Sequence, residues 1–304
     1  MSRARTKPHH AAISVRSYQE LAEHAAAFAA GHLNLLFVLG DPGLGKSQCF
    51  RRAVGASACW IDGTATAFGM YCLAYENRDM PLVLDDVDGL HADKDGIRLL
   101  KCICQTDALK RISWQSNASA LTSRNIPRQF TTTSRVAIIA NQWWSLRMDV
   151  AALEDRGHVL LFEPSPVEVH RQAATWFWDQ QIFDFVGAHL HLSERPSFRV
   201  YVLAYQFKVA GLDWQTAVLS RFLKGTAVAV ARLVADLSFT TQEERASAFV
   251  ASSAGCRATF FNHARRLKAP PAVPHFQVNG TRPVDHLPGV WTNGGHGAQE
   301  SLDF

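Results

Sequence analysis

The chain has 304 residues, of which 47% are hydrophobic and 19% charged, and its formal net charge is +4. The apolar share excludes a globally disordered chain, because disordered chains hold too few hydrophobic residues to form a core. No apolar run approaches the roughly 18 residues of a membrane-spanning helix. The small positive charge does not by itself indicate nucleic-acid binding. We therefore expect a cytoplasmic protein of about two domains without a membrane contact.

The N-terminal half alternates between helical and strand patterns. Residues 1–30 are expected to form a polar arm over 1–15 and then a helix over about 16–31, where apolar side chains recur every three or four positions. Four short apolar runs follow, at 33–39, 81–84, 136–140 and 159–162. Such runs are typical of parallel strands that are buried on both faces. With helices between them, such as Gly96 to Leu109, they predict an α/β domain with a mostly parallel sheet over 31–165.

The C-terminal half has a different character. Strand signals disappear after Pro166, and the spacing over 166–225 predicts a small all-helical domain. A further helical element is expected over 226–269. Residues 270–304 are rich in Pro, Gly and Asn and show no periodicity, which predicts a tail that is disordered or lies loosely on the surface.

The strongest motif directly follows the first apolar run. It matches the pattern GxxxxGKS and consists of Gly40, Asp41, Pro42, Gly43, Leu44, Gly45, Lys46 and Ser47. Glycines allow the backbone N–H groups to point at phosphate oxygens, and the next helix directs its N-terminus at the same group. Lys46 is expected to reach the β- and γ-phosphates and Ser47 to bind Mg²⁺. The motif predicts an ATP–Mg²⁺ site in a P-loop NTPase three-layer sandwich.

Two other strand ends carry polar side chains. Asp85 and Asp86 follow the run at 81–84, and Asn141 follows the run at 136–140. In a P-loop fold the acidic strand is expected beside the phosphate loop, with Asp85 holding Mg²⁺ through water and Asp86 activating the attacking water. The Asn141 amide is expected to contact the γ-phosphate or that water. The alternatives are that the acids cap a helix and that the asparagine forms a turn.

The order of these features resembles the AAA+ family of ATPases, of the type found in phages, plasmids and mobile elements. An arginine-containing segment, 151–157, follows the asparagine, and the resemblance covers about residues 30–225. It implies ATP hydrolysis in a homo-oligomeric ring or helical assembly. It also implies that Arg156 acts as an arginine finger on a neighbouring subunit, with Arg128 and Arg135 as competing candidates. The alternative is that Arg156 is a surface residue paired with an acidic neighbour.

The same resemblance makes the helical region a lid. Arg199, near the start of a helix, is then expected to act as a second sensor that touches the nucleotide. One departure concerns Asp85-Asp86, where the family usually has Asp-Glu. The shorter side chain of Asp86 leaves open which residue acts as the base and how fast ATP is turned over.

Residues 241–268 are expected to form two helices around a turn at 252–255. The second helix carries Arg257, Asn262, Arg265, Arg266 and Lys268, and its apolar residues are expected to supply a buried stripe. A short helix, a turn and a basic helix resemble a helix-turn-helix, whose second helix enters the major groove of DNA. The alternative is an ordinary solvated face.

Three functions are compatible with these patterns. The first is an AAA+-like ATPase that remodels or loads a partner in DNA replication, transposition or mobile-element maintenance, with DNA and a replication or transposition protein as candidate partners. The second is a nucleotide-switched DNA-binding regulator with little turnover. The third is a small-molecule kinase on the same phosphate loop, which the arginine finger, the asparagine and the long helical lid disfavour.

Overall fold

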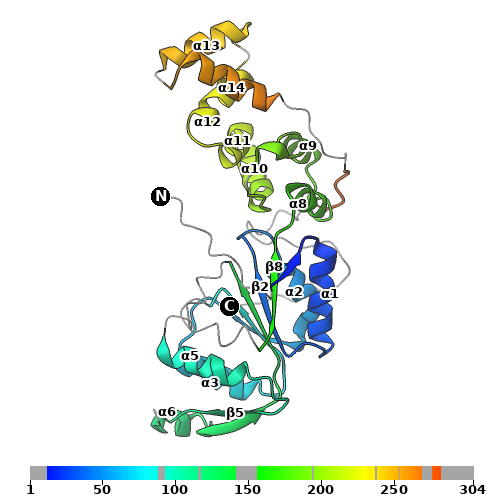
Figure 1. Cartoon of the computed structure of the whole chain (residues 1–304), viewed down its shortest axis with the longest axis vertical. Coiled ribbons are helices and arrows are strands. Elements are labelled where there is room, and N and C mark those ends of the chain that lie inside the picture. The colour runs from blue at the N-terminus through cyan, green and yellow to red at the C-terminus, as the bar shows by residue number, and fades with distance from the viewer. Residues whose placement is uncertain are drawn as a thin grey trace. The chain divides into compact units, whose positions relative to one another are not determined.

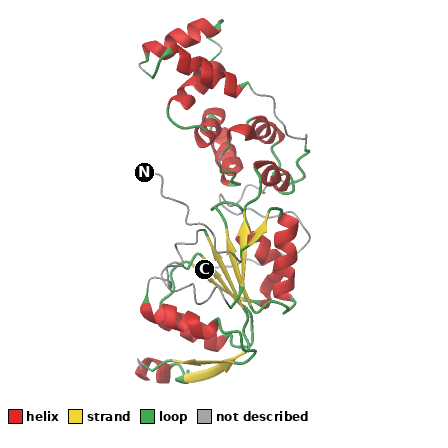
Figure 2. Ribbon diagram, in the orientation of Figure 1, coloured by secondary structure: helices red, strands yellow, loops and turns green. Residues whose placement is uncertain are grey.

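The computed structural model describes residues 12–87, 93–115, 118–141, 156–193, 195–236, 238–252, 254–268 and 276–281. The chain divides into two compact units, Met1–Pro164 and Ser165–Phe304. Strands occur in the first unit, and the described part of the second is helical apart from its connections (Figures 1 and 2). No helix among the described residues has the length and apolar character needed to cross a membrane.

The first unit is built around a six-stranded sheet in which all neighbouring strands run parallel. Its order is β1-β8-β2-β7-β4-β3. The strands are β1 (Ile13–Val15), β2 (Leu35–Leu39), β3 (Cys59–Asp62), β4 (Leu82–Asp85), β7 (Val136–Ala140) and β8 (His158–Phe162). The four apolar runs in the sequence form β2, β4, β7 and β8. The predicted α/β class with a parallel sheet is therefore confirmed.

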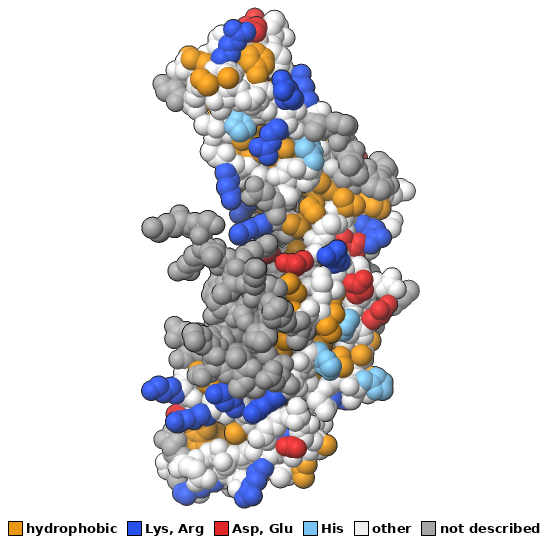
Figure 3. Space-filling view, in the orientation of Figure 1, with side chains coloured by type: hydrophobic (Ala, Val, Ile, Leu, Met, Phe, Trp, Pro, Cys, Tyr) orange, Lys and Arg blue, Asp and Glu red, His pale blue; other side chains and the backbone are white. Residues whose placement is uncertain are grey.

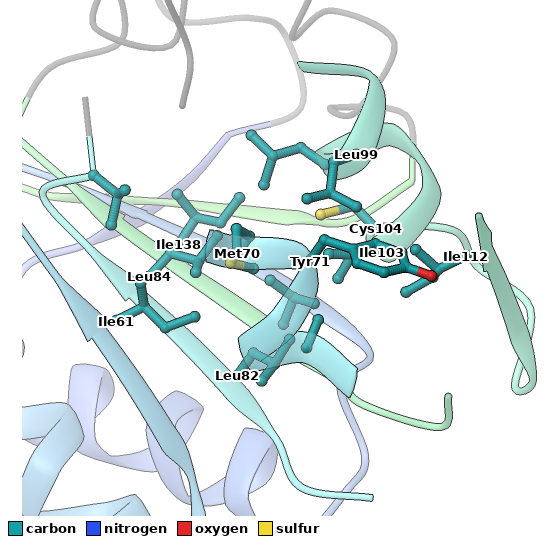
Figure 4. Packing of buried hydrophobic residues seen from close by; sticks show 14 of the residues in the cluster. Ile61, Met70, Tyr71, Leu82, Leu84, Leu99, Ile103, Cys104, Ile112 and Ile138 are labelled. Carbon is teal, nitrogen blue, oxygen red and sulfur yellow. The ribbon is translucent and has the colours of Figure 1, made fainter. Parts of the chain in front are cut away.

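Helices cover both faces of this sheet and complete three layers (Figure 1). On one face α1 (Tyr18–Ala29) packs against α2 (Lys46–Val54), which ends in the short 3₁₀ helix Gly55–Ser57. On the other face lie α3 (Ala67–Glu76) and α5 (Lys94–Ile103). Alternate strand residues, such as Leu84 and Ile138, meet Met70 and Tyr71 of α3 in the core (Figure 4). This burial on both faces explains why the strands are continuously apolar.

The chain segment that connects β4 to β7 forms a second, smaller sheet. It is an antiparallel pair of β5 (Lys110–Ser113) and β6 (Gln129–Thr132), joined through α6 (Ala118–Ser123). The helix expected over Gly96 to Leu109 is shorter than predicted at its C-terminal end, because α5 ends at Ile103 and the chain turns into β5. Its start lies earlier because the Asp93 side chain accepts a hydrogen bond from the Gly96 N–H and caps the helix.

One expectation for the start of the first unit was wrong. Residues 13–15, assigned to a polar arm, form β1 and pair in parallel with β8. In the sheet, β7 lies between β2 and the acidic strand β4. The asparagine strand is therefore the direct neighbour of the phosphate-loop strand. The remaining arm residues, 1–11, lie outside the described part of the chain.

The second unit contains seven described α-helices. They are α8 (Pro166–Ala173), α9 (Gln180–Ala188), α10 (Arg199–Val209), α11 (Trp214–Phe222), α12 (Thr226–Ala235), α13 (Gln242–Ala251) and α14 (Arg257–Leu267), with a 3₁₀ helix at Leu190–Leu192. The predicted helix pair over 241–268 corresponds to α13 and α14. Both pack on α12 through a buried core that includes Val230, Phe249 and Phe260. The C-terminal element is therefore a three-helix bundle.

The expectation of a loose C-terminal tail was wrong for residues 276–281, the strap. Its backbone is hydrogen-bonded to the helical unit, with the Asn279 N–H donating to the Ala174 carbonyl at 2.8 Å and Gly280 to Phe177 at 2.9 Å. These bonds satisfy carbonyl groups just beyond the end of α8. The strap is thus an integral part of the helical unit.

Candidate nucleotide-binding site

The predicted phosphate loop connects the end of β2 to the start of α2. Gly43 and Gly45 have φ angles of 80° and 71°, in the left-handed region that favours glycine. At Gly40 a Cβ would lie 2.6 Å from the Phe162 carbonyl oxygen, so a larger residue does not fit beside β8. No side chain caps α2, so the N-terminal N–H groups of this helix face the loop and favour an anion there.

Lys46 links the loop to the neighbouring strand. Its side chain is buried, and Nζ donates hydrogen bonds to the carbonyl oxygens of Gly40 (2.8 Å) and Asp41 (3.1 Å) and to Asn141 Oδ1 (3.2 Å). These three acceptors are neutral. A phosphate oxygen placed at this end of the loop would be attracted to the ammonium group.

Asn141 continues this connection to the acidic strand. Its Nδ2 donates to Asp86 Oδ1 at 2.8 Å, so the amide bridges Lys46 and Asp86. Asp86 has a φ of 52°, which is uncommon for a residue with a side chain, and its N–H donates to the Ile139 carbonyl at 3.1 Å. The chain thus leaves β4 in a turn that directs the Asp86 carboxylate toward β7.

Asp85 lies at the end of β4, next to the start of α2. Burial raises the pKa of its carboxyl group above the ordinary value, and a hydrogen bond with the Ser47 hydroxyl opposes that rise. The neighbouring carboxylates of Asp86 and Asp62 raise this pKa further, while the charge of Arg51 lowers it. A half-buried carboxylate among other acids is an electrostatic environment that a cation would stabilise.

Ser47 and Asp85 are the residues that fit Mg²⁺. A hydroxyl and a carboxylate oxygen are ligands that this hard cation prefers, and they lie within hydrogen-bonding reach of each other. Among the described residues, no group of three His, Cys, Asp or Glu side chains could hold a metal ion by itself. Mg²⁺ usually takes most of its ligands from phosphate oxygens and water, with one or two from the protein.

Sequence reasoning missed two groups at this site. Tyr18 of α1 donates its buried hydroxyl to the Leu44 carbonyl of the phosphate loop at 2.8 Å. At the edge strand β3, Arg51 lies over the Trp60 ring at 4.0 Å and pairs with Asp62 at 2.6 Å. Neither group belongs to a motif, and β3 was not predicted, so no signal in the sequence indicated them.

The arginine candidates do not gather around the phosphate loop. Arg156 is exposed, donates to the Lys101 carbonyl at 3.1 Å and lies two residues before β8, at the amino edge of the sheet. The phosphate loop lies at the opposite, carboxyl edge. Arg135 donates to the Ala29 carbonyl at the end of α1, and Arg128 is exposed next to β6.

Arg199 belongs to the other unit. It is the first residue of α10, where the sequence predicted a helix start, and its side chain is exposed. Residues 151–155 of the predicted finger segment lie outside the described chain. Of the predicted site residues, the structure therefore brings together the phosphate loop, Asp85, Asp86 and Asn141 within the first unit.

Comparisons with known proteins give distant likenesses. No protein-family model matches the chain. An uncharacterized 36.7 kDa protein in the nrdC-mobD intergenic region of Enterobacteria phage T4 is 26% identical over 136 residues, 42% of this chain and 40% of that protein. The match thus spans less than half of that relative's length.

Two solved structures are similar at low scores. NtrX from Brucella abortus, in complex with ATP, has a TM-score of 0.35 at 10% identity and covers 84% of this chain and 69% of its own. PCH-2 from C. elegans has a TM-score of 0.30 at 14% identity, and the match covers 82% of this chain and 67% of PCH-2. These values are too low to assign an activity to the chain.

Proposed function

We propose that the chain is an ATPase of the AAA+ type, which binds ATP with Mg²⁺ and hydrolyses it by in-line attack of water on the γ-phosphate. The observation that supports this most is the hydrogen-bonded connection from Lys46 through Asn141 to Asp86. It joins a phosphate-binding cation, a neutral amide and a carboxylate at the carboxyl edge of one parallel sheet, where such sheets bind their ligands.

Each residue has a distinct role in this proposal. The loop N–H groups and Lys46 bind the phosphates, and Ser47 and Asp85 hold Mg²⁺, which supplies charge neutralisation when bound. Asp86 orients the water and accepts its proton. Asn141 fixes the Asp86 carboxylate and contacts the γ-phosphate without adding negative charge. Most of the catalysis then comes from positioning and electrostatic stabilisation.

The binding step is tested by Lys46→Ala, which is expected to abolish ATP binding in an equilibrium titration with a fluorescent ATP analogue. Lys224→Ala, at an exposed lysine of the helical unit, is the matched control and is expected to bind like wild type. ATP binding by the Lys46 variant at wild-type affinity would refute the nucleotide site.

We further propose a homo-oligomer, a ring or helical assembly, in which Arg156 acts on the nucleotide of the neighbouring subunit. Arg156 and the phosphate loop lie at opposite edges of the sheet, about 16 Å apart along a five-residue strand. At this distance Arg156 is better placed to reach a nucleotide bound to a neighbouring subunit than one bound to its own phosphate loop. A planar guanidinium is suited to stabilising the charge of a phosphoryl group in transfer.

Two measurements test the assembly. Light scattering is expected to show a larger particle with a non-hydrolysable ATP analogue than without nucleotide. In mixtures of wild type with Arg156→Ala, ATP turnover is expected to fall out of proportion to the share of variant. Turnover that simply follows that share at every ratio would exclude a role between subunits.

Arg199 is proposed as the second sensor, which contacts nucleotide from the helical unit. Arg199→Ala is then expected to weaken ATP binding while leaving Mg²⁺ dependence unchanged. The biological output is proposed to be remodelling or loading of a DNA-bound partner in replication, transposition or mobile-element maintenance, on the strength of the AAA+ resemblance and the basic C-terminal helix.

A second candidate is a nucleotide-switched DNA-binding regulator with little turnover. It is favoured by the α12–α14 bundle, in which Asn262, Arg265 and Arg266 are exposed on α14. Arg257 is less available, because it pairs with Glu243 at 2.5 Å. Steady-state phosphate release with and without DNA separates the two candidates: the ATPase turns over many ATP molecules per chain, whereas the switch releases about one.

A further inference from the structure

Positive charge is concentrated in the stretch that runs from the N-cap of α5 to the residue before β7. Residues 93–135 contain eight Lys and Arg but three Asp and Glu, an excess larger than the net +4 of the whole chain. Figure 3 shows blue side chains gathered over α5 and over the β5–α6 segment in the lower part of the view. The inserted sheet therefore lies in a locally basic surface.

Two of these eight cations are used inside the fold. Lys110 is buried, and its Nζ donates to the Ser134 carbonyl at 2.7 Å. Arg135 donates to the Ala29 carbonyl at 3.3 Å. The other six reach the surface, and we call them the basic face: Lys94, Arg98, Lys101, Arg111, Arg124 and Arg128.

On α5 the cations share one side of the helix. Lys94, Arg98 and Lys101 are spaced by four and three residues, which places them along about 10 Å of one stripe. The opposite side is buried in the core through Leu99 and Ile103, and Figure 4 shows Ile103 beside Ile112 of β5. Arg98 shares its charge with Asp95 at 3.2 Å, a pair that is largely exposed and weak.

On the β5–β6 sheet some polar side chains also point outward. Ile112 and Phe130 are buried, whereas their strand neighbours Arg111 and Gln129 are exposed and hydrogen-bonded to each other at 2.7 Å. Within the described chain, the arginines at 111, 124 and 128 form no ion pair with a carboxylate. All three arginines are exposed to solvent.

We propose that the basic face binds the phosphate backbone of a nucleic acid. Guanidinium groups interspersed with exposed amide and hydroxyl donors match the oxygens of successive phosphates. A protein partner would require an apolar centre in the interface. In the described part of 93–135, Leu109 is the one strongly exposed large hydrophobic residue. This site is separate from α14 and does not depend on ATP binding.

The test is fluorescence anisotropy of the full chain with a labelled single-stranded oligonucleotide and its duplex, over about 50 to 200 mM salt. The face triple replaces Arg98, Arg111 and Arg124 by Glu. The matched control makes the same charge change at three exposed cations of the helical unit, Arg221, Lys224 and Arg232. A circular-dichroism melt and the ATP affinity show whether each variant is folded.

The face triple is expected to bind the single strand at least tenfold more weakly than wild type, and to lose about 2 units of the log–log salt slope. If the triple does not fold, the single variant Arg111→Glu is used instead, and it is expected to lose about 0.7 unit of the log–log salt slope. Equal weakening by the control triple would overturn the proposal, because net charge alone would then explain binding. Equal competition by polyglutamate and by unlabelled oligonucleotide would also overturn it and indicate an acidic protein partner.

Discussion

The Asn141 bridge makes a quantitative prediction about turnover. Asn141→Ala removes the 2.8 Å hydrogen bond to the Asp86 carboxylate, and a bond to a charged group contributes about 1.5–3 kcal/mol. Because Asp86 is exposed, the lower part of that range applies, and about 1.5–2 kcal/mol on the barrier lowers kcat about 10- to 30-fold. Lys46 keeps its two carbonyl acceptors, so ATP affinity is expected to fall less, about fivefold for about 1 kcal/mol.

The assay is steady-state phosphate release over a range of ATP concentrations, with a separate titration of nucleotide affinity. Gln19→Ala serves as the control, because this exposed amide bonds to Glu23 on the outside of α1. A kcat of the Asn141 variant within twofold of wild type would refute the role of the amide in positioning Asp86. A large loss of affinity with unchanged kcat would instead make it a binding residue.

Three further perturbations follow from the site and the strap. Tyr18→Phe removes a buried hydrogen bond to the phosphate loop, worth about 1 kcal/mol, and is expected to weaken ATP binding about fivefold in a nucleotide titration. The raised pKa of Asp85 means that its ionised form, which Mg²⁺ requires, is reached at higher pH than usual. Asp62→Asn removes a charge that raises this pKa, so Mg²⁺-dependent ATP binding is expected to persist to lower pH. Gly280→Ala places a Cβ 1.9 Å from the Trp176 carbonyl oxygen and is expected to release the strap, seen as faster limited proteolysis of the helical unit.

Each of these has a clear contrary result. Wild-type affinity of the Tyr18 variant would show that the loop holds its shape without α1. An acid limb that moves to higher pH in Asp62→Asn would reverse the electrostatic assignment. If Gln277→Ala, at an exposed strap position, is cleaved as fast as Gly280→Ala, then the backbone fit of the glycine is not what holds the strap.

The sequence predicts the strands that are buried on both faces and fails for the others. β2, β4, β7 and β8 are recognisable because burial requires uninterrupted apolar residues. β1 has three residues, and β5 and β6 alternate between polar and apolar in a partly exposed sheet. Short or half-exposed strands carry little hydrophobic signal, so tertiary pairing decides them.

The candidate site was predictable as far as motifs extend. The phosphate loop, Asp85, Asp86 and Asn141 each follow an apolar strand, and parallel strands bring their carboxyl ends to one edge. The position of β7 between β2 and β4, which makes Asn141 the bridge, depends on strand order, and spacing along the chain does not specify that order. The role of Tyr18 was not predictable either, because the Leu44 carbonyl to which it donates lies 26 residues away along the chain.

The central claim is that Asp86 activates water against a nucleotide held by the phosphate loop. Its most direct test compares wild type with Asp86→Asn, measuring phosphate release and ATP affinity on the same samples. We predict that wild type turns over ATP in the presence of Mg²⁺, while the variant binds ATP with similar affinity and releases no phosphate above background. Phosphate release by Asp86→Asn at the wild-type rate would contradict the claim.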